Sequence, residues 1–257
     1  MSLEHTQAIV IRAFPWSETS VIATLFTRDV GKISVLAKGA RRPKSPFEAA
    51  LDLLSICNVV FIGKSSDSLD VLTEAKLQKR FRAGAQSLLR LYAGYYIAEL
   101  VDKMTDKNDR LPEVFALAKS SLASLEDSKC DPRAIVLRCE LQLLRMLGHL
   151  PSFSQCVQCS RPVGLAAEDN EGWVLFSTWS GGMVCDGCRA SAKQITRLSN
   201  SVQELFINFS QTDWQSIALD WYPREHRTVT RKVIARYLMF ILDRQFNLHP
   251  YLEELGR

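Results

Sequence analysis

The chain has 257 residues, 47% of them hydrophobic and 23% charged, which is typical of a globular protein of one or two domains. Its 32 Lys and Arg against 28 Asp and Glu leave a net charge of only +4, so a nucleic-acid-binding surface would require local clustering of cations. No apolar run is long enough for a membrane helix, and Met1–His5 lacks the features of a secretory signal. We therefore expect a cytoplasmic protein that does not associate with membranes.

The N-terminal part has the pattern of β-structure. Five short strands are predicted, at Gln7–Arg12, Val21–Thr27, Lys32–Lys38, Leu54–Ile62 and Leu69–Glu74. The segment Gly39–Pro46, which follows the third strand, contains one Gly and two Pro and is expected to be a loop. Five short strands ahead of any long helix predict a small closed barrel, and an OB-fold has that strand count and size. An SH3-like barrel is the main alternative.

The hydrophobic period changes to that of α-helices from about residue 78. Helices are predicted at 84–104, from 111 onward, at 131–147, at 199–209 and at 228–246. Asp131, which precedes Pro132, is the expected N-cap of the third helix, and Gly148 is its expected end.

Four cysteines form two Cys-x-x-Cys pairs, at Cys156, Cys159, Cys185 and Cys188. This spacing matches a zinc ribbon. Each pair can bind one face of a zinc ion, and the two pairs together close a tetrahedral site that leaves no position for a substrate, so we expect a structural Zn²⁺. Two disulfides, two redox pairs or four unrelated cysteines are the alternatives. The remaining Cys57, Cys130 and Cys139 fit a reducing cytoplasm.

These elements predict an α+β multidomain protein. An N-terminal OB-fold β-barrel, residues 1–78, would bind nucleic acid. An α-helical domain, residues 79–257, would follow it, with a four-cysteine, zinc-ribbon-like lobe inserted at residues 153–190.

Five cations follow one another between Asp29 and Glu48 with no acid among them: Lys32, Lys38, Arg41, Arg42 and Lys44. Three of them, Arg41, Arg42 and Lys44, lie in the predicted loop Gly39–Pro46, and a loop with three cations can follow a phosphate backbone. OB barrels combine a basic groove with aromatic stacking. Phe14, Trp16 and Phe47 are the candidate stacking residues, with core packing as the alternative for each.

A second basic cluster lies near the C-terminus, at Arg224, Arg227, Arg231, Lys232 and Arg236. Arg227 with Arg231, and Lys232 with Arg236, are four residues apart, so each pair shares a side of the predicted helix. We expect this cluster to contact DNA or the acidic tail of a partner, unless it is only a solvated helix face. A third basic stretch, Lys76, Lys79, Arg80 and Arg82, lies where the strands give way to helices.

Motifs of catalysis are absent from the sequence. It has no phosphate-binding Gly-x-x-x-x-Gly-Lys-Ser/Thr loop, no His-Glu-x-x-His pair and no Gly-x-Ser-x-Gly turn. We therefore expect a binding protein and not an enzyme, with no catalytic residues.

Several segments, taken in their order along the chain, resemble the bacterial RecO family. They are Ala8–Arg12, Ser17–Ser20, Gly31–Lys32, Lys38–Ser45 and Leu143–Pro151 ahead of the first cysteine pair. The resemblance covers essentially the whole chain.

The resemblance implies a mediator of recombinational DNA repair. Such a protein binds single- and double-stranded DNA, anneals complementary strands and acts with RecR. It helps to load the RecA recombinase onto DNA coated by single-strand-binding protein, whose acidic C-terminal tail docks on the helical body. The resemblance also implies a cytoplasmic, nucleoid-associated location, and DNA contacts by Lys32, Lys38, Arg41, Arg42 and Lys44. We expect an apolar groove beside Arg231, Lys232 and Arg236 to receive the tail.

Two other classes of function stay open. One is a zinc-ribbon transcription or translation factor whose ribbon touches nucleic acid, although the segment from Val163 to Gly182 contains acids and neither Lys nor Arg. The other is a zinc enzyme with an open coordination position, for which His149 is the nearest non-thiolate ligand in the sequence.

Overall fold

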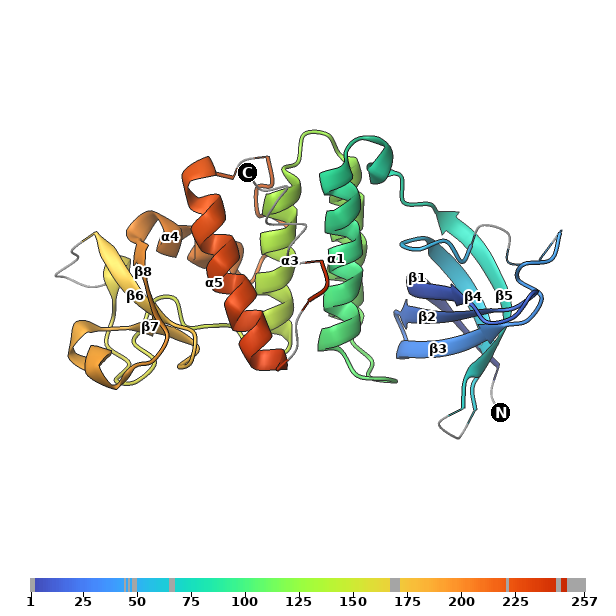
Figure 1. Ribbon diagram of the computed structural model, residues 1–257, viewed down its shortest axis with the longest axis horizontal. Helices are drawn as coiled ribbons and strands as arrows, with labels where there is room; N and C mark the ends of the chain where they lie inside the picture. Colours follow the sequence, from blue (N-terminus) through green and yellow to red (C-terminus); the bar gives the residue numbers. More distant parts are fainter. Residues whose placement is uncertain are drawn as a thin grey trace. The chain divides into compact units, whose positions relative to one another are not determined.

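The computed structural model describes residues 3–43, 45, 47, 50–64, 68–166, 172–220, 222–243 and 246–248. The chain divides into two compact units, Met1–Ser128 and Lys129–Arg257. Figure 1 labels the elements of both units. The described part of the first unit therefore contains two α-helices as well as the strands, and the proposed domain boundary after residue 78 stays a prediction. No described helix has the combination of length and apolar character that crossing a membrane requires.

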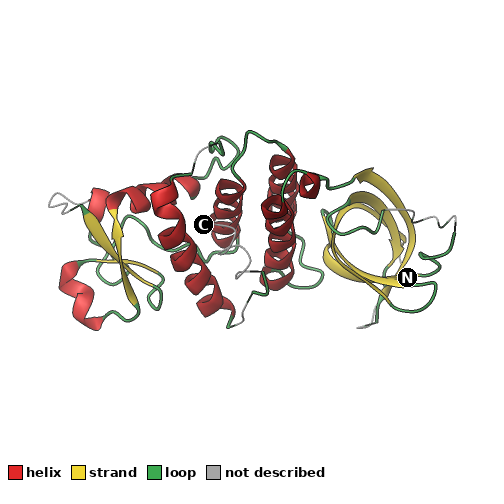
Figure 2. Ribbon diagram, turned by 45° about the horizontal axis from the view of Figure 1, so that its top comes forward, coloured by secondary structure: helices red, strands yellow, loops and turns green. Residues whose placement is uncertain are grey.

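The first unit contains a closed five-stranded barrel (Figure 2). Its strands are β1 (Leu3–Pro15), β2 (Val21–Thr27), β3 (Gly31–Ala37), β4 (Ile56–Ile62) and β5 (Asp70–Lys79). They pair in the order β1-β2-β3-β5-β4, and an antiparallel β1–β4 pair closes the barrel. The parallel β3–β5 pair and this order are those of an OB-fold, so the prediction of an OB barrel is confirmed and the SH3-like alternative is wrong.

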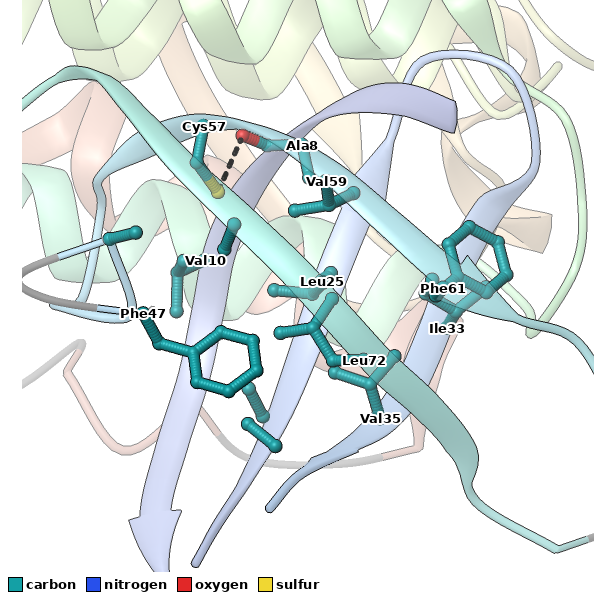
Figure 3. Packing of buried hydrophobic residues seen from close by; sticks show 14 residues of the cluster. Ala8, Val10, Leu25, Ile33, Val35, Phe47, Cys57, Val59, Phe61 and Leu72 are labelled. Atoms are coloured by element: carbon teal, nitrogen blue, oxygen red, sulfur yellow. Dashed lines mark hydrogen bonds between the residues drawn. The ribbon is translucent and has the colours of Figure 1, made fainter. Parts of the chain in front are cut away.

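The barrel interior is filled because side chains alternate across each strand. In β3 every second residue is buried, from Gly31 to Ala37. Leu25, Val59 and Phe61 meet in the core with no more than 1% of their surface exposed (Figure 3). Phe47, from the loop after β3, also enters this core and is 4% exposed (Figure 3). Phe47 is therefore a packing residue, which is the alternative given for it above, and it is not available for base stacking.

Two helices complete the first unit, α1 (Leu88–Met104) and α2 (Pro112–Glu126). The predicted start of α1 at residue 84 is wrong, since Gly84 lies in a single 3₁₀ turn, Ala83–Ala85. The helix begins after Ser87, whose hydroxyl accepts a hydrogen bond from the backbone N–H of Arg90 and so caps the helix. α2 begins at Pro112 as predicted and places Phe115 against Phe26 of β2, with ring centroids 6.2 Å apart.

The described residues of the second unit form three α-helices, α3 (Pro132–Met146), α4 (Asn200–Phe209) and α5 (Arg224–Leu242). Asp131 caps α3 by accepting a hydrogen bond from the N–H of Arg133, as the sequence predicts. Gly148 ends this segment in the left-handed region, with a φ of 76°. α5 begins four residues earlier than predicted, directly after Pro223. A proline is tolerated at the start of a helix because a backbone N–H there has no carbonyl partner within the helix, so its absence costs no hydrogen bond.

The inserted lobe is built on a three-stranded antiparallel sheet in the order β7-β6-β8 (Figure 1). β6 is Trp173–Ser177, β7 is Gly182–Val184 and β8 is Ile195–Ser199. β7 and β8 are short, and neither shows a clear alternation of apolar residues in the sequence. Buried Gln203 of α4 attaches the lobe by donating hydrogen bonds to the carbonyls of Phe153 and Val163, at 2.7 and 3.0 Å.

Candidate metal centre and nucleic-acid interface

The four predicted cysteines come together in the lobe. The Sγ atoms of Cys156, Cys159, Cys185 and Cys188 all lie within 4.8 Å of one another. The Sγ atoms of Cys159 and Cys185 are 3.6 Å apart. In a tetrahedral zinc site with Zn–S bonds of about 2.3 Å, neighbouring sulfurs are about 3.8 Å apart, so this arrangement fits one metal ion.

Backbone hydrogen bonds hold both Cys-x-x-Cys turns. The N–H of Ser160 donates to the carbonyl of Cys156 at 2.8 Å, and the N–H of Cys188 donates to the carbonyl of Cys185 at 3.0 Å. The first turn lies along β7, because the N–H of Val157 donates to the carbonyl of Met183 at 2.9 Å. The sheet therefore sets the distance between the two pairs, which are far apart in the sequence.

The surroundings of the thiols influence their ionisation. Arg161 donates from Nε to Sγ of Cys159 at 3.4 Å and lowers the pKa of Cys159 to about 6. Hydrogen bonds to Cys185 and Cys159 favour the neutral thiol of Cys188 and raise its pKa to about 12. A cation bound by all four sulfurs would lower every one of these pKa values, since the thiolate is the metal ligand.

Four sulfurs complete a tetrahedral coordination sphere, so the site fits a structural ion better than a catalytic one. His149, the nearest non-thiolate ligand in the sequence, does not belong to this cluster among the described residues. Its backbone carbonyl instead accepts a hydrogen bond from the hydroxyl of Tyr237 at 2.8 Å.

The basic loop after β3 is attached to the loop between β1 and β2. Arg41 donates from its backbone N–H to the carbonyl of Thr19 at 3.0 Å and from Nη1 to the carbonyl of Ser17 at 3.2 Å. Lys38, Arg41 and Arg42 are all exposed, and no described carboxylate forms an ion pair with any of them.

Two exposed aromatic side chains lie at the same end of the barrel. Phe14 at the end of β1 and Trp16 in the following loop are 42% and 63% exposed. Because Arg41 bonds to Ser17, the next residue after Trp16, the cations and the rings are brought to one surface. OB barrels use this combination of cations and stacking platforms, and they use the loop between strands 1 and 2.

Lys32 does not share this surface. Its ammonium lies 3.4 Å from Oδ1 of Asp102 in α1 and also donates to the backbone carbonyl of Asp102, and the side chain is only 12% exposed. Lys32 therefore attaches the barrel to α1, which argues against its predicted DNA contact. Lys44 lies outside the described residues.

Part of the third basic stretch is also neutralised within the first unit. Lys79 lies 2.6 Å from a carboxylate oxygen of Glu126, and Arg80 lies 3.3 Å from one of Asp52. These carboxylates are distant in sequence, so the sequence pattern overstates the local positive charge.

The C-terminal cluster separates into two sides, as the spacing predicts. Arg231 donates through both terminal nitrogens to Glu140 of α3, a carboxylate with none of its surface exposed, and one of these bonds measures 2.9 Å. Arg227 donates to Asp131 at 2.9 Å. These two arginines attach α5 to α3, so neither is available to DNA or to a partner's tail, and their assignment to such a contact is not supported. Arg224, Lys232 and Arg236 are exposed.

The fold and the cysteine cluster together define a class: a mixed α+β protein with an OB barrel, a helical part and a four-cysteine lobe able to bind a metal ion. Residues 1–81 match the sequence model described as the N-terminal domain of recombination protein O, and residues 85–247 match the model of its C-terminal domain. The chain belongs to the RecO family.

Individual relatives agree with this assignment. A DNA repair protein RecO from Rhodopirellula baltica is 45% identical over 192 residues, which cover 75% of this chain and 69% of that protein. The RecO protein of Symbiobacterium thermophilum is 29% identical over 256 residues, covering 99% of this chain and 98% of the relative. That of Salinibacter ruber is 38% identical over 151 residues, 59% of this chain and 58% of the relative.

Proposed function

We propose that this chain is a recombination mediator that binds single- and double-stranded DNA, anneals complementary strands and helps to load RecA onto DNA coated by single-strand-binding protein. The observation that carries the proposal is the hydrogen-bonded junction between Arg41 and the loop at Ser17–Thr19, which brings exposed cations and exposed rings together at one end of an OB barrel. Membership of the RecO family supports it.

The DNA-binding role is assigned to Lys38, Arg41 and Arg42, with Phe14 and Trp16 as the stacking residues. Each cation neutralises a phosphate and releases a counterion, and each ring can stack on a base of any identity. Annealing then requires no nucleophile, because the cations reduce the repulsion between two strands while they pair. The proposed activity is therefore non-enzymatic.

A structural Zn²⁺ would be held by Cys156, Cys159, Cys185 and Cys188. When bound, it would fix the two Cys-x-x-Cys turns against each other and so stabilise a lobe whose own sheet is small. The strands, Gln203 and the four thiolates would then act together to hold the lobe on the helices.

The partners implied by the family are RecR, single-strand-binding protein and, indirectly, RecA, and a location at the nucleoid in the cytoplasm would follow. Arg224, Lys232 and Arg236 stay candidates for contact with DNA or with the acidic tail of single-strand-binding protein, since their side chains are exposed.

The test is the annealing of two complementary oligonucleotides, each coated with single-strand-binding protein and labelled with one member of a fluorescent donor–acceptor pair. We expect the chain to accelerate annealing, and Arg41→Glu with Arg42→Glu to remove most of the acceleration. Lys107→Glu with Arg110→Glu is the matched control. It makes the same change in charge on exposed residues of the first unit, next to Asn108, whose N–H donates to Lys32 at the opposite end of β3. Equal annealing by the two variants would contradict the proposal.

A further inference from the structure

The second unit exposes a pair of aromatic side chains that the proposed function does not use. Trp179, in the turn between β6 and β7, is 54% exposed, and Phe240, near the end of α5, is 41% exposed. Their ring centroids are 5.4 Å apart and their planes are inclined by 48°. Burial in the core would be the usual fate of such rings, so their exposure in one place requires a reason.

The turn that carries Trp179 is held firmly. The N–H of Ser180 donates to Oγ of Ser177 at 3.1 Å, and the N–H of Thr178 donates to the carbonyl of Gln194 at 3.3 Å. Gly181, with a φ of 74°, lies against Tyr237 of α5, where an added Cβ would be 3.4 Å from the tyrosine hydroxyl. The indole is therefore presented to solvent on an anchored backbone.

Cations flank the two rings. The ammonium of Lys193 lies 5.4 Å from the ring centroid of Trp179. On α5, Lys232, Arg236 and Phe240 follow at four-residue intervals and so lie along one side of the helix. All three cations are exposed, and no described carboxylate forms an ion pair with any of them.

Cations outnumber acids along this line of residues. Within α5 the one acid, Glu225, lies in the first turn, about two turns before Lys232, and the exposed C-cap residue Asp243 follows Phe240 by three positions. The surface therefore combines two rings with three cations, which we name the Trp179 surface: Lys193, Trp179, Phe240, Arg236 and Lys232. Its charge complements a polyanion.

The amount of exposed apolar surface distinguishes an acidic protein partner from a nucleic acid. A protein partner would need an apolar interface core, but the other large exposed apolar side chain of the described second unit is Leu165, which lies beside Gln203 of α4. Two rings provide what one or two stacked bases require, and three cations provide for the adjoining phosphates.

We propose that the Trp179 surface is a second binding site for single-stranded nucleic acid, in which Trp179 and Phe240 stack on bases and Lys193, Arg236 and Lys232 contact phosphates. The inference rests on the proposed annealing function, because a protein that brings two strands together benefits from a site for each strand.

The experiment uses the full chain with the barrel surface disabled by Arg41→Glu and Arg42→Glu, so that only residual binding is measured. The probe is fluorescein-labelled oligothymidylate, followed by fluorescence anisotropy over a salt series. We expect Trp179→Ala to weaken this residual binding at least about fivefold, since loss of one stacked base costs about 1 kcal/mol or more. Trp179→Phe should retain most of the affinity, and Leu165→Ala, which truncates another exposed side chain of the same unit, should retain all of it. Lys193→Gln with Arg236→Gln should reduce the salt slope by about 1.4, because each phosphate contact on a single strand contributes about 0.7.

A second readout locates the contact. Oligothymidylate that contains one 5-iodouracil should cross-link on irradiation to a peptide that includes Trp179. Unchanged affinity in Trp179→Ala, together with no such cross-link, would overturn the second site, while a large difference between the wild type and the barrel variant would leave the proposed function intact. If Trp179→Ala instead loses only the binding of a synthetic aspartate-rich peptide, the surface is a protein-docking site and the inference is wrong. Equal melting temperature and metal content in the alanine and phenylalanine variants would exclude misfolding as the cause.

Discussion

The salt dependence of DNA binding measures how many cations of the barrel surface contact phosphates. Each phosphate contact on a single strand contributes about 0.7 to the slope of log K against log salt. Removing Arg41 and Arg42, both exposed and without a described carboxylate partner, should therefore reduce the slope by about 1.4. Over a fourfold range of salt this difference corresponds to about a sevenfold change in affinity.

The assay is fluorescence anisotropy of labelled oligothymidylate across a salt series, with the metal content of each sample determined in parallel. Arg41→Glu with Arg42→Glu should bind more weakly and with a flatter slope, while Lys107→Glu with Arg110→Glu should keep the wild-type slope. An unchanged slope in the first variant would falsify the assignment of this loop to DNA. An equal fall in both variants would show that total charge, and not the loop, controls binding.

Three further outcomes follow from the structure. Arg231→Met removes the guanidinium that pairs with the buried carboxylate of Glu140 and should lower the free energy of unfolding by about 3–5 kcal/mol in urea titrations. Adding Glu140→Leu should restore most of this loss, and the exposed neighbour variant Lys232→Met should change little; a harmless Arg231→Met would contradict the role of this pair. Cys188→Ser should abolish metal binding and destabilise the lobe, while the barrel still binds DNA. A variant whose lobe stays stable but which loses a catalytic activity would indicate a catalytic metal instead. Burial raises the pKa of Cys57 from 9.0 to about 12, so between these values the unfolded chain loses this proton and the folded chain keeps it. Stability should therefore fall as pH rises above 9, by up to about 1.4 kcal/mol per unit more than in Cys57→Ala, and identical pH profiles of the two proteins would refute this.

Local features of the chain could be predicted from the sequence because they depend on neighbouring residues. The alternation of side chains predicted β2 with its observed limits, Val21–Thr27, and Asp131 with Pro132 predicted the start of α3. The spacing of the four cysteines predicted a cluster that the structure brings together within 4.8 Å. Each of these signals is contained in a short segment whose geometry the backbone largely determines.

Pairing between distant segments could not be predicted in this way. Lys32 and Arg41 belong to the same basic run, yet Asp102, seventy positions beyond Lys32, engages the first, while the second remains on the surface. Arg231 and Lys232 are adjacent, yet only Arg231 meets the buried Glu140.

The sequence by itself determined the barrel, the order of the main helices and the four cysteines, because periodicity and spacing are local properties. Only the tertiary structure decided which cations are free to bind a ligand, since burial next to a carboxylate depends on residues brought together from far along the chain. The same holds for Trp179 and Phe240, two ordinary aromatic residues in the sequence that become a surface only when the β6–β7 turn packs on α5.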